Sequence, residues 1–102
     1  MKEPENFVRI VNRKRYSVKT ATLIASDDFW DGHNFERHGR NTFLYRTPKG
    51  EFFTVTVTQW QGEQDSLDPI AQDAAIELFE GSLSEHAVTY AEAFPGVKVE
   101  DA

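Results

Sequence analysis

The chain contains no cysteine, and this absence excludes disulfide bridges, thiolate nucleophiles and zinc sites built on cysteine. Long hydrophobic runs are also missing: no stretch of consecutive apolar residues exceeds four, which is far too short to cross a bilayer. The first six residues, MKEPEN, lack the apolar segment of a secretory signal. We therefore expect a cytoplasmic protein that does not associate with a membrane.

Basic residues are scarce in the second part of the chain. Residues 61–102 hold one lysine against ten acidic residues, a net charge of −9, whereas residues 1–60 hold ten basic against seven acidic residues, a net charge of +3. Five of the basic residues lie close together in sequence: Arg9, Arg13, Lys14, Arg15 and Lys19. We interpret the asymmetry as two solvated faces of opposite sign, which favour solubility. The alternative is a basic edge that contacts phosphate.

The sequence does contain enough apolar material for one core. Its 102 residues are 39% hydrophobic and include eight Phe, three Tyr and two Trp. This composition is typical of a packed globular domain rather than a disordered chain. Because there is no internal repeat and no linker, we predict a single domain over residues 1–102, with loose ends at 1–6 and 97–102.

The clearest predicted element is a β-hairpin. Its strands, 40–47 and 51–60, flank Pro48-Lys49-Gly50, in which proline fixes φ and glycine accepts a positive φ. Apolar residues alternate with threonines in the second strand, so one face of that strand is predicted to be buried. The side chains on this face are Phe53, Val55 and Val57.

The remaining patterns predict an α+β domain. The predicted elements are a strand at 7–11, a helix at 18–26 capped by Ser17, a helix that begins near Asp68 or Gln72, and a helix at 84–94. With the hairpin they give a small antiparallel sheet of three to four strands with two to three helices, in the order β-α-β-β-α. The predicted core is Val8, Ile10, Leu23, Ile24, Phe43, Tyr45, Phe53, Val55, Val57, Ile76, Phe79, Tyr90 and Phe94.

The stretch richest in side chains that can act in catalysis or bind a metal is SDDFWDGHNFERHGR, residues 26–40. Its residue types are those of a metal-dependent or hydrolytic enzyme that would use His33, Glu36 and His38. The spacing argues against it, because the two histidines are five positions apart and so share neither a helix face nor a strand face. We therefore predict no metal, no cofactor and no catalytic residue, and we expect the protein not to be an enzyme.

The aromatic residues of the same stretch allow two interpretations. They can lie over the sheet and fix a long connection, or they can form an exposed patch beside arginines. If the stretch is functional, we expect it to bind a protein partner, because Trp and Arg often dominate the energy of protein interfaces. The residues of this predicted site are Trp30, Phe35, Arg37 and Arg40.

Several segments together resemble a family of small uncharacterised bacterial proteins, some of them found in phages or mobile elements. The segments are RYSVKTATLIAS, WDGHNFERHGRNTFLYRTPKGEFF, TQWQGEQDSLDPI, AAIELFEG and YAEAF, and they extend from about Ile10 to Phe94. The resemblance implies one intact domain in β-α-β-β-α order and carries no known activity. The chain departs from the family pattern at Ala71, where a Ser or Thr cap is expected.

Three functions follow from these features. The first is a non-catalytic protein-binding or accessory module, a monomer or weak homodimer with an unidentified protein partner. The second is a nucleic-acid-binding protein that uses the basic edge from Arg9 to Lys19, although the acidic second half makes nucleic acid the less expected partner. The third is the enzyme built on His33, Glu36 and His38.

Overall fold

The protein is mostly β. The computed structural model describes residue 4 and residues 6–27, 40–58, 62 and 64–102, with the side chain of Arg40 left out. Within those residues there are seven strands and two short helices. Their bounds are β1 Val8–Val11, β2 Lys14–Ser17, β3 Thr22–Ser26, β4 Arg40–Arg46, β5 Phe52–Thr58, β6 Ser66–Ile70, α1 Gln72–Glu80, β7 Glu85–His86 and α2 Tyr90–Ala93.

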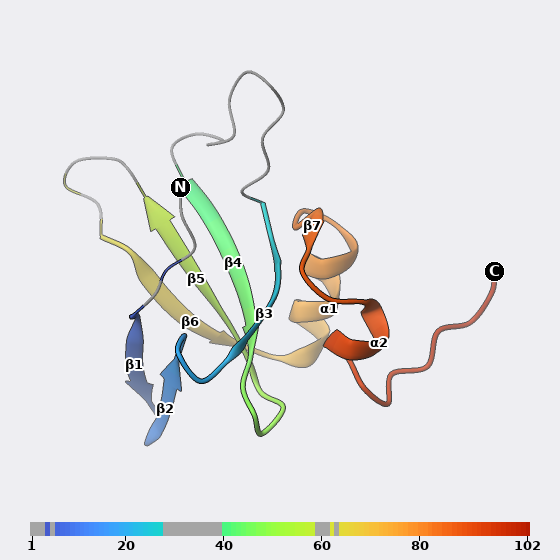
Figure 1. Ribbon diagram of the computed structural model, residues 1–102, viewed down its shortest axis with the longest axis horizontal. Coiled ribbons are helices and arrows are strands. Elements are labelled where there is room, and N and C mark those ends of the chain that lie inside the picture. Colours follow the sequence, from blue (N-terminus) through green and yellow to red (C-terminus); the bar gives the residue numbers. More distant parts are fainter. Residues whose placement is uncertain (1–3, 5, 28–39, 59–61, 63) are drawn as a thin grey trace.

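The strands form two antiparallel sheets. Five of them make the main sheet, in the order β6-β5-β4-β3-β7, and β1 and β2 make a separate two-stranded sheet, here called the ribbon. The ribbon lies against one face of the main sheet, and α1 and α2 lie against the other (Figure 1). The main sheet is therefore the middle of three layers, and this is the architecture that positions everything described below.

Each face of the main sheet has its own core. The ribbon-side core consists of Tyr16, Val18, Phe43, Tyr45, Phe53, Val55, Val57 and Leu67. The helix-side core consists of Ile24, Ala25, Leu44, Phe52, Ala75, Phe79, Leu83, Ala93 and Phe94. Alternation along the strands sorts neighbouring residues between the two cores, as Phe52 and Phe53 show. The predicted hairpin and the predicted inward face of its second strand are confirmed.

The predicted β-α-β-β-α order and the sheet of three to four strands are wrong. The predicted helix at 18–26 is a turn followed by β3. A β-bulge in β3 explains the error, because the register shifts between Leu23 and Ala25 and leaves Ile24 as an extra residue. Ile24 and Ala25 consequently both join the helix-side core, and adjacent apolar residues on one face imitate a helical pattern.

The second half also differs from the prediction. The segment 84–94 is not one helix: β7 pairs with β3, and only the four residues of α2 are helical. Of the two starts proposed for the preceding helix, Gln72 is the observed one, because Asp68 and Pro69 belong to β6. The N-cap of α1 is Ala71, which makes no side-chain capping bond. Within the described residues, neither helix is long and apolar enough to span a bilayer.

The first strand is in place, but its two faces are reversed relative to the predicted core. Val8 and Ile10 are exposed, by 49% and 63%, whereas Phe7 and Val11 pack against the ribbon-side core. Burial of either face of β1 would fit the alternation of its side chains. Only the position of the ribbon over the main sheet decides which face is buried. Of the other predicted core residues, Leu23, Ile76 and Tyr90 are half-buried and the rest are buried.

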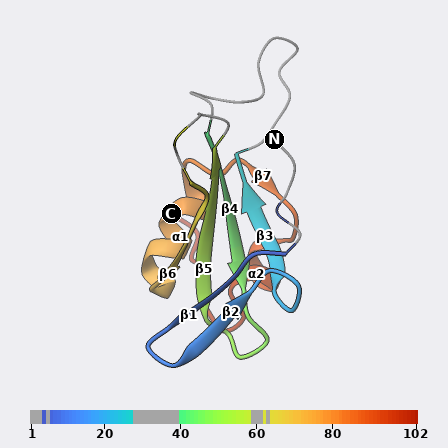
Figure 2. The ribbon, with the colours of Figure 1, turned by 90° about the vertical axis from the view of Figure 1, so that its left-hand side faces the viewer.

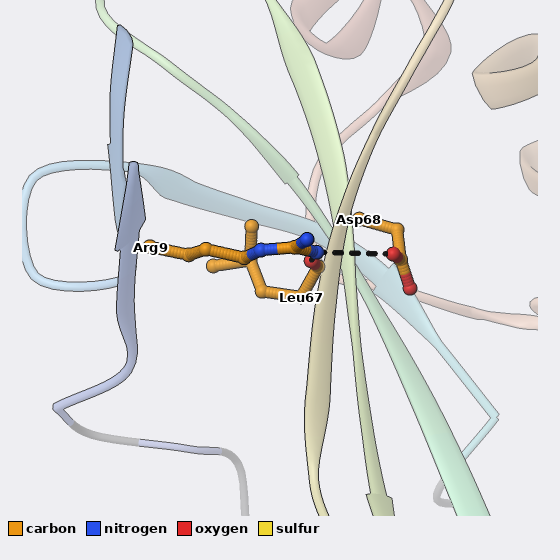
Figure 3. Close-up of polar contacts among 3 residues, drawn as sticks. All are labelled: Arg9, Leu67 and Asp68. Atoms are coloured by element: carbon orange, nitrogen blue, oxygen red, sulfur yellow. Dashed lines mark hydrogen bonds and ion pairs between the residues drawn. The ribbon is translucent and has the colours of Figure 1, made fainter. Parts of the chain in front are cut away.

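The ribbon is fastened to the main sheet by an arginine on its inner face. Arg9 reaches from β1 to β6, where its Nη1 donates a hydrogen bond to the carbonyl oxygen of Leu67 at 2.6 Å (Figure 3). The same nitrogen lies 3.3 Å from Oδ1 of Asp68. Both charged side chains are more than half exposed, so the ion pair itself contributes little, and the bond to the carbonyl fixes the position.

Helix α2 is short and depends on its N-terminal cap. Thr89 and Glu92 form a capping box, in which the Thr89 side chain accepts from the Glu92 backbone N–H and the Glu92 carboxylate accepts from the Thr89 backbone N–H and hydroxyl. These bonds, the backbone N–H first, lower the pKa of Glu92 below its ordinary value. The stabilisation is therefore present above the pKa of the unfolded chain and is lost as the pH falls through the lowered pKa.

Thr89→Ala is expected to move the pKa of Glu92 back towards its ordinary value. The substitution removes the hydroxyl that donates to the carboxylate, while the backbone N–H remains, so the return is partial. A carbon-13 NMR titration of the Glu92 carboxyl group in both proteins measures the difference. An unchanged pKa in Thr89→Ala would contradict the capping box.

Candidate functional site

The predicted partner-binding residues Trp30, Phe35 and Arg37 lie outside the described residues, and of Arg40 only the backbone is described. The possible metal ligands His33, Glu36 and His38 lie outside them as well. Among the residues that the structure does describe, there is no group of three His, Cys, Asp or Glu side chains that could hold a metal ion.

One acidic residue at the start of the 26–40 stretch is described, and its role is structural. The carboxylate of Asp27 accepts a hydrogen bond from the backbone N–H of Thr42 at 2.8 Å and from Nδ2 of Asn41 at 3.2 Å. Asn41 is fully buried, so this carboxylate satisfies a polar group in the interior. Asp27 thus joins the ends of β3 and β4.

The described residues bring cations together elsewhere, in an open groove of about 660 Å³. Three turns meet there: the β1–β2 turn, the turn between β2 and β3, and the β4–β5 turn. Figure 2 shows all three at the end of the molecule away from the N-terminus. The groove, here called the basic groove, is lined by Arg13, Lys14, Arg15, Thr20, Thr47, Pro48, Lys49 and Glu51.

The β1–β2 turn holds an arginine in a conformation that suits glycine. Val11 and Lys14 are paired, so Asn12 and Arg13 form a two-residue turn, and both have positive φ (52° and 66°). Turns of this kind favour Asn followed by Gly, because a side chain with positive φ is strained by about 1–2 kcal/mol. Arg13 occupies the glycine position and keeps that strain. A strained residue at a surface turn is a reason to look for a function of its side chain.

The opposite wall of the basic groove is rigid. In the β4–β5 turn, the Thr47 N–H donates to the Glu51 carbonyl at 2.8 Å, the Gly50 N–H to the Thr47 carbonyl at 2.9 Å, and the Glu51 N–H to Thr47 Oγ1 at 3.0 Å. Gly50 has a φ of 88°, which the turn requires and glycine adopts without strain. Lys49 is therefore presented from a fixed backbone.

One ion pair crosses the basic groove. Lys14 Nζ donates a hydrogen bond to Glu51 Oε1, and this bond, together with the attraction between the charges, raises the pKa of Lys14 above its ordinary value. The ion pair therefore favours the charged form of Lys14. Arg13, Arg15 and Lys49 also line the groove, so its positive charge exceeds the single negative charge of Glu51.

The charge at this end of the molecule is opposite to that of the chain. Residues 12–20 carry four basic and no acidic side chains, and residues 46–51 carry two basic and one acidic, which together give a net charge of +5. The whole chain has a net charge of −6. Residues 72–102, which include both helices, hold seven acidic side chains and one lysine. The distribution of charge is therefore strongly dipolar, and its positive end lies at the three turns.

The sequence indicates part of this site and misses the rest. Three members of the predicted basic edge, Arg13, Lys14 and Arg15, do line the basic groove, whereas Arg9 turns to β6 and Lys19 is not in the lining. Lys49, Thr47 and Glu51 come from the β4–β5 turn, about 35 positions further along the chain. Nothing in the sequence pattern shows that the two turns meet, because their proximity depends on how the ribbon folds over the main sheet.

Chemically, the residues that line the basic groove offer cations and hydroxyl groups. Proline is the apolar residue of its lining, and the aromatic ring nearest in sequence, Tyr16, is buried in the ribbon-side core. Such a lining is suited to oxyanions, since guanidinium and ammonium groups form charge-assisted hydrogen bonds with phosphate and carboxylate oxygens.

Comparisons with protein-family models, curated proteins and solved structures found no match for this chain.

Proposed function

We propose that this chain is a non-catalytic binding module that holds nucleic acid by its phosphate groups in the basic groove. The observation that carries the proposal is the net charge of +5 gathered at the three turns of a chain whose net charge is −6. A local charge of this sign and size attracts a polyanion in spite of the acidic remainder, because charge interactions weaken beyond about 10 Å at moderate salt.

Phosphate is favoured over the carboxylates of an acidic protein by the composition of the lining. Protein interfaces draw most of their energy from buried aromatic and apolar anchors, and the basic groove contributes one proline of that kind. Phosphate groups need only cations and hydrogen-bond donors, which the groove supplies from two turns. The strain at Arg13 supports the same conclusion, since glycine would serve the turn better and could not contact an anion through a side chain.

The ion pair of Glu51 favours a binding role for the basic groove over a catalytic one. Glu51 is hydrogen-bonded to Lys14 and so is already occupied by a cation. The other lining side chains are arginines, lysines, threonines and a proline, which bind and orient but are not placed as an acid–base pair.

Arg13→Gly is expected to weaken nucleic-acid binding about five- to tenfold while making the protein more stable. The substitution removes one phosphate contact, so the slope of log affinity against log salt concentration should fall by about one. It also restores glycine where φ is positive, which should stabilise the fold by about 1 kcal/mol. Fluorescence anisotropy with a labelled 20-nucleotide oligonucleotide at several salt concentrations measures the first effect, and urea titration measures the second.

Lys98→Ala is the matched control, because it removes one positive charge from the exposed C-terminal segment, outside the lining of the basic groove. It should leave both the affinity and the salt slope unchanged. Equal losses in the two variants would show that only the total charge matters and would overturn the proposal. No binding of the wild-type protein at low salt, or tighter binding of polyglutamate than of the oligonucleotide, would overturn it as well.

A further inference from the structure

Resting on the proposed function, we infer that the nucleic acid is single-stranded and that its unpaired bases lie on the outer face of the ribbon, against Val8 and Ile10. These two residues are among the large hydrophobic side chains that the described part of the chain exposes. They stand two positions apart on one strand, so both project from the same face. Together they form a small apolar platform on a face whose other ribbon residues, Arg15 and Ser17, are polar.

The apolar platform is continuous with the basic groove. Ile10 is paired with Arg15 across the ribbon, and residues directly opposite each other in an antiparallel pair project on the same face. Arg15 is also one of the residues that line the groove. A strand whose phosphates lie in the groove therefore has its next bases beside Arg15 and Ile10. The planar guanidinium of Arg15 can stack on a base as well as pair with a phosphate.

The ribbon is held firmly enough to act as a platform. Its inner face is fixed by Tyr16, which is buried and packs edge-on against Phe53 at 5.7 Å between ring centroids. Arg9 ties β1 to the Leu67 carbonyl of β6. With its inner face anchored, the ribbon presents Val8 and Ile10 without needing to order them when a ligand arrives, and this saves the entropy of ordering on binding.

Only a single strand can use both surfaces at once. In a duplex the flat faces of the bases are stacked on one another, and a protein meets phosphates and base edges. An apolar aliphatic surface next to a phosphate-binding groove matches unstacked bases, whose faces are free. The contacts are to base faces rather than to donor and acceptor patterns, so binding should depend little on sequence.

The test compares three ligands of the same length and charge per strand: a 15-nucleotide oligothymidylate, an abasic 15-mer with the same phosphates, and a 15-base-pair duplex. The double substitution Val8→Thr with Ile10→Thr keeps β-branched side chains in the strand and removes apolar character. Val99→Thr makes the same chemical change in the exposed C-terminal segment and is the matched control. Thermal melts establish that all variants are folded.

We expect the wild-type protein to bind oligothymidylate about tenfold more tightly than the abasic strand and more tightly than the duplex. The double variant should lose this preference while keeping the affinity for the abasic strand, and Val99→Thr should behave as wild type. Equal binding of oligothymidylate and the abasic strand, or tighter binding of the duplex, would overturn the inference and leave phosphate binding intact. Failure to bind any of the three ligands would instead refute the proposed function itself.

Discussion

Val55→Asp is expected to abolish folding. Val55 is completely buried in the ribbon-side core, where its partners across the neighbouring strands are Phe43 on β4 and Leu67 on β6. A carboxylate at this position would either stay charged without a partner or take up a proton, and both outcomes cost several kcal/mol. The free energy of unfolding of a domain of this size is about 5–15 kcal/mol. A loss of several kcal/mol therefore removes much or all of the stability and leaves little or no folded protein.

Urea titration followed by far-ultraviolet circular dichroism measures this effect. Val99→Asp is the matched control, because it places the same side chain at a valine that is 68% exposed, and its midpoint should not change. A Val55→Asp protein with the wild-type midpoint would show that the inward face of β5 has been misassigned.

The second large effect is expected from Phe94→Ala, on the opposite face of the sheet. Phe94 is buried at the end of α2, and its ring centroid lies 5.3 Å from that of Phe52, 5.4 Å from Phe79 and 5.3 Å from Tyr90. Removing it leaves a cavity among three aromatic rings and should destabilise the protein by about 3–5 kcal/mol. Helix α2 has only four residues and cannot persist without this packing.

Phe7→Ala provides the comparison, since Phe7 is only half-buried at the margin of the ribbon-side core and should cost clearly less. The midpoints of the two variants in urea give the difference. If Phe94→Ala were as stable as Phe7→Ala, then α2 and the C-terminal segment would not belong to the cooperative unit.

The parts of the fold that the sequence predicts are those with local rules. The β4–β5 hairpin follows from alternation in β5 and from a turn that contains both proline and glycine, and neither signal depends on the remainder of the chain. The sequence allows α1 to start at Asp68 or at Gln72, and Gln72 is the observed start because Asp68 and Pro69 extend β6 along β5. Both starts are compatible with the local sequence, and the pairing of β6 with β5 selects one of them.

The parts that it does not predict depend on distant contacts. The bulge at Ile24 places two adjacent residues in one core, which breaks the period of 2 typical of a strand and imitates the period of a helix. The ribbon can bury either of its faces by its own pattern, and Tyr16 packing on Phe53 selects one. The candidate site was half predictable for the same reason: the run Arg13-Lys14-Arg15 is visible as a charge cluster, whereas Lys49 joins it only through tertiary structure.

The contact of Arg9 with β6 has a consequence for the behaviour of the protein at high concentration. A β-sheet grows by adding strands at its edges, and the edges of the main sheet are β6 and β7. On β6, the Leu67 carbonyl is already taken by Arg9, and Pro69 has no N–H to offer an incoming strand. On the other side, β7 is only two residues long and carries Glu85. These features make both edges poor templates for a further strand, and they disfavour fibril growth through the main sheet.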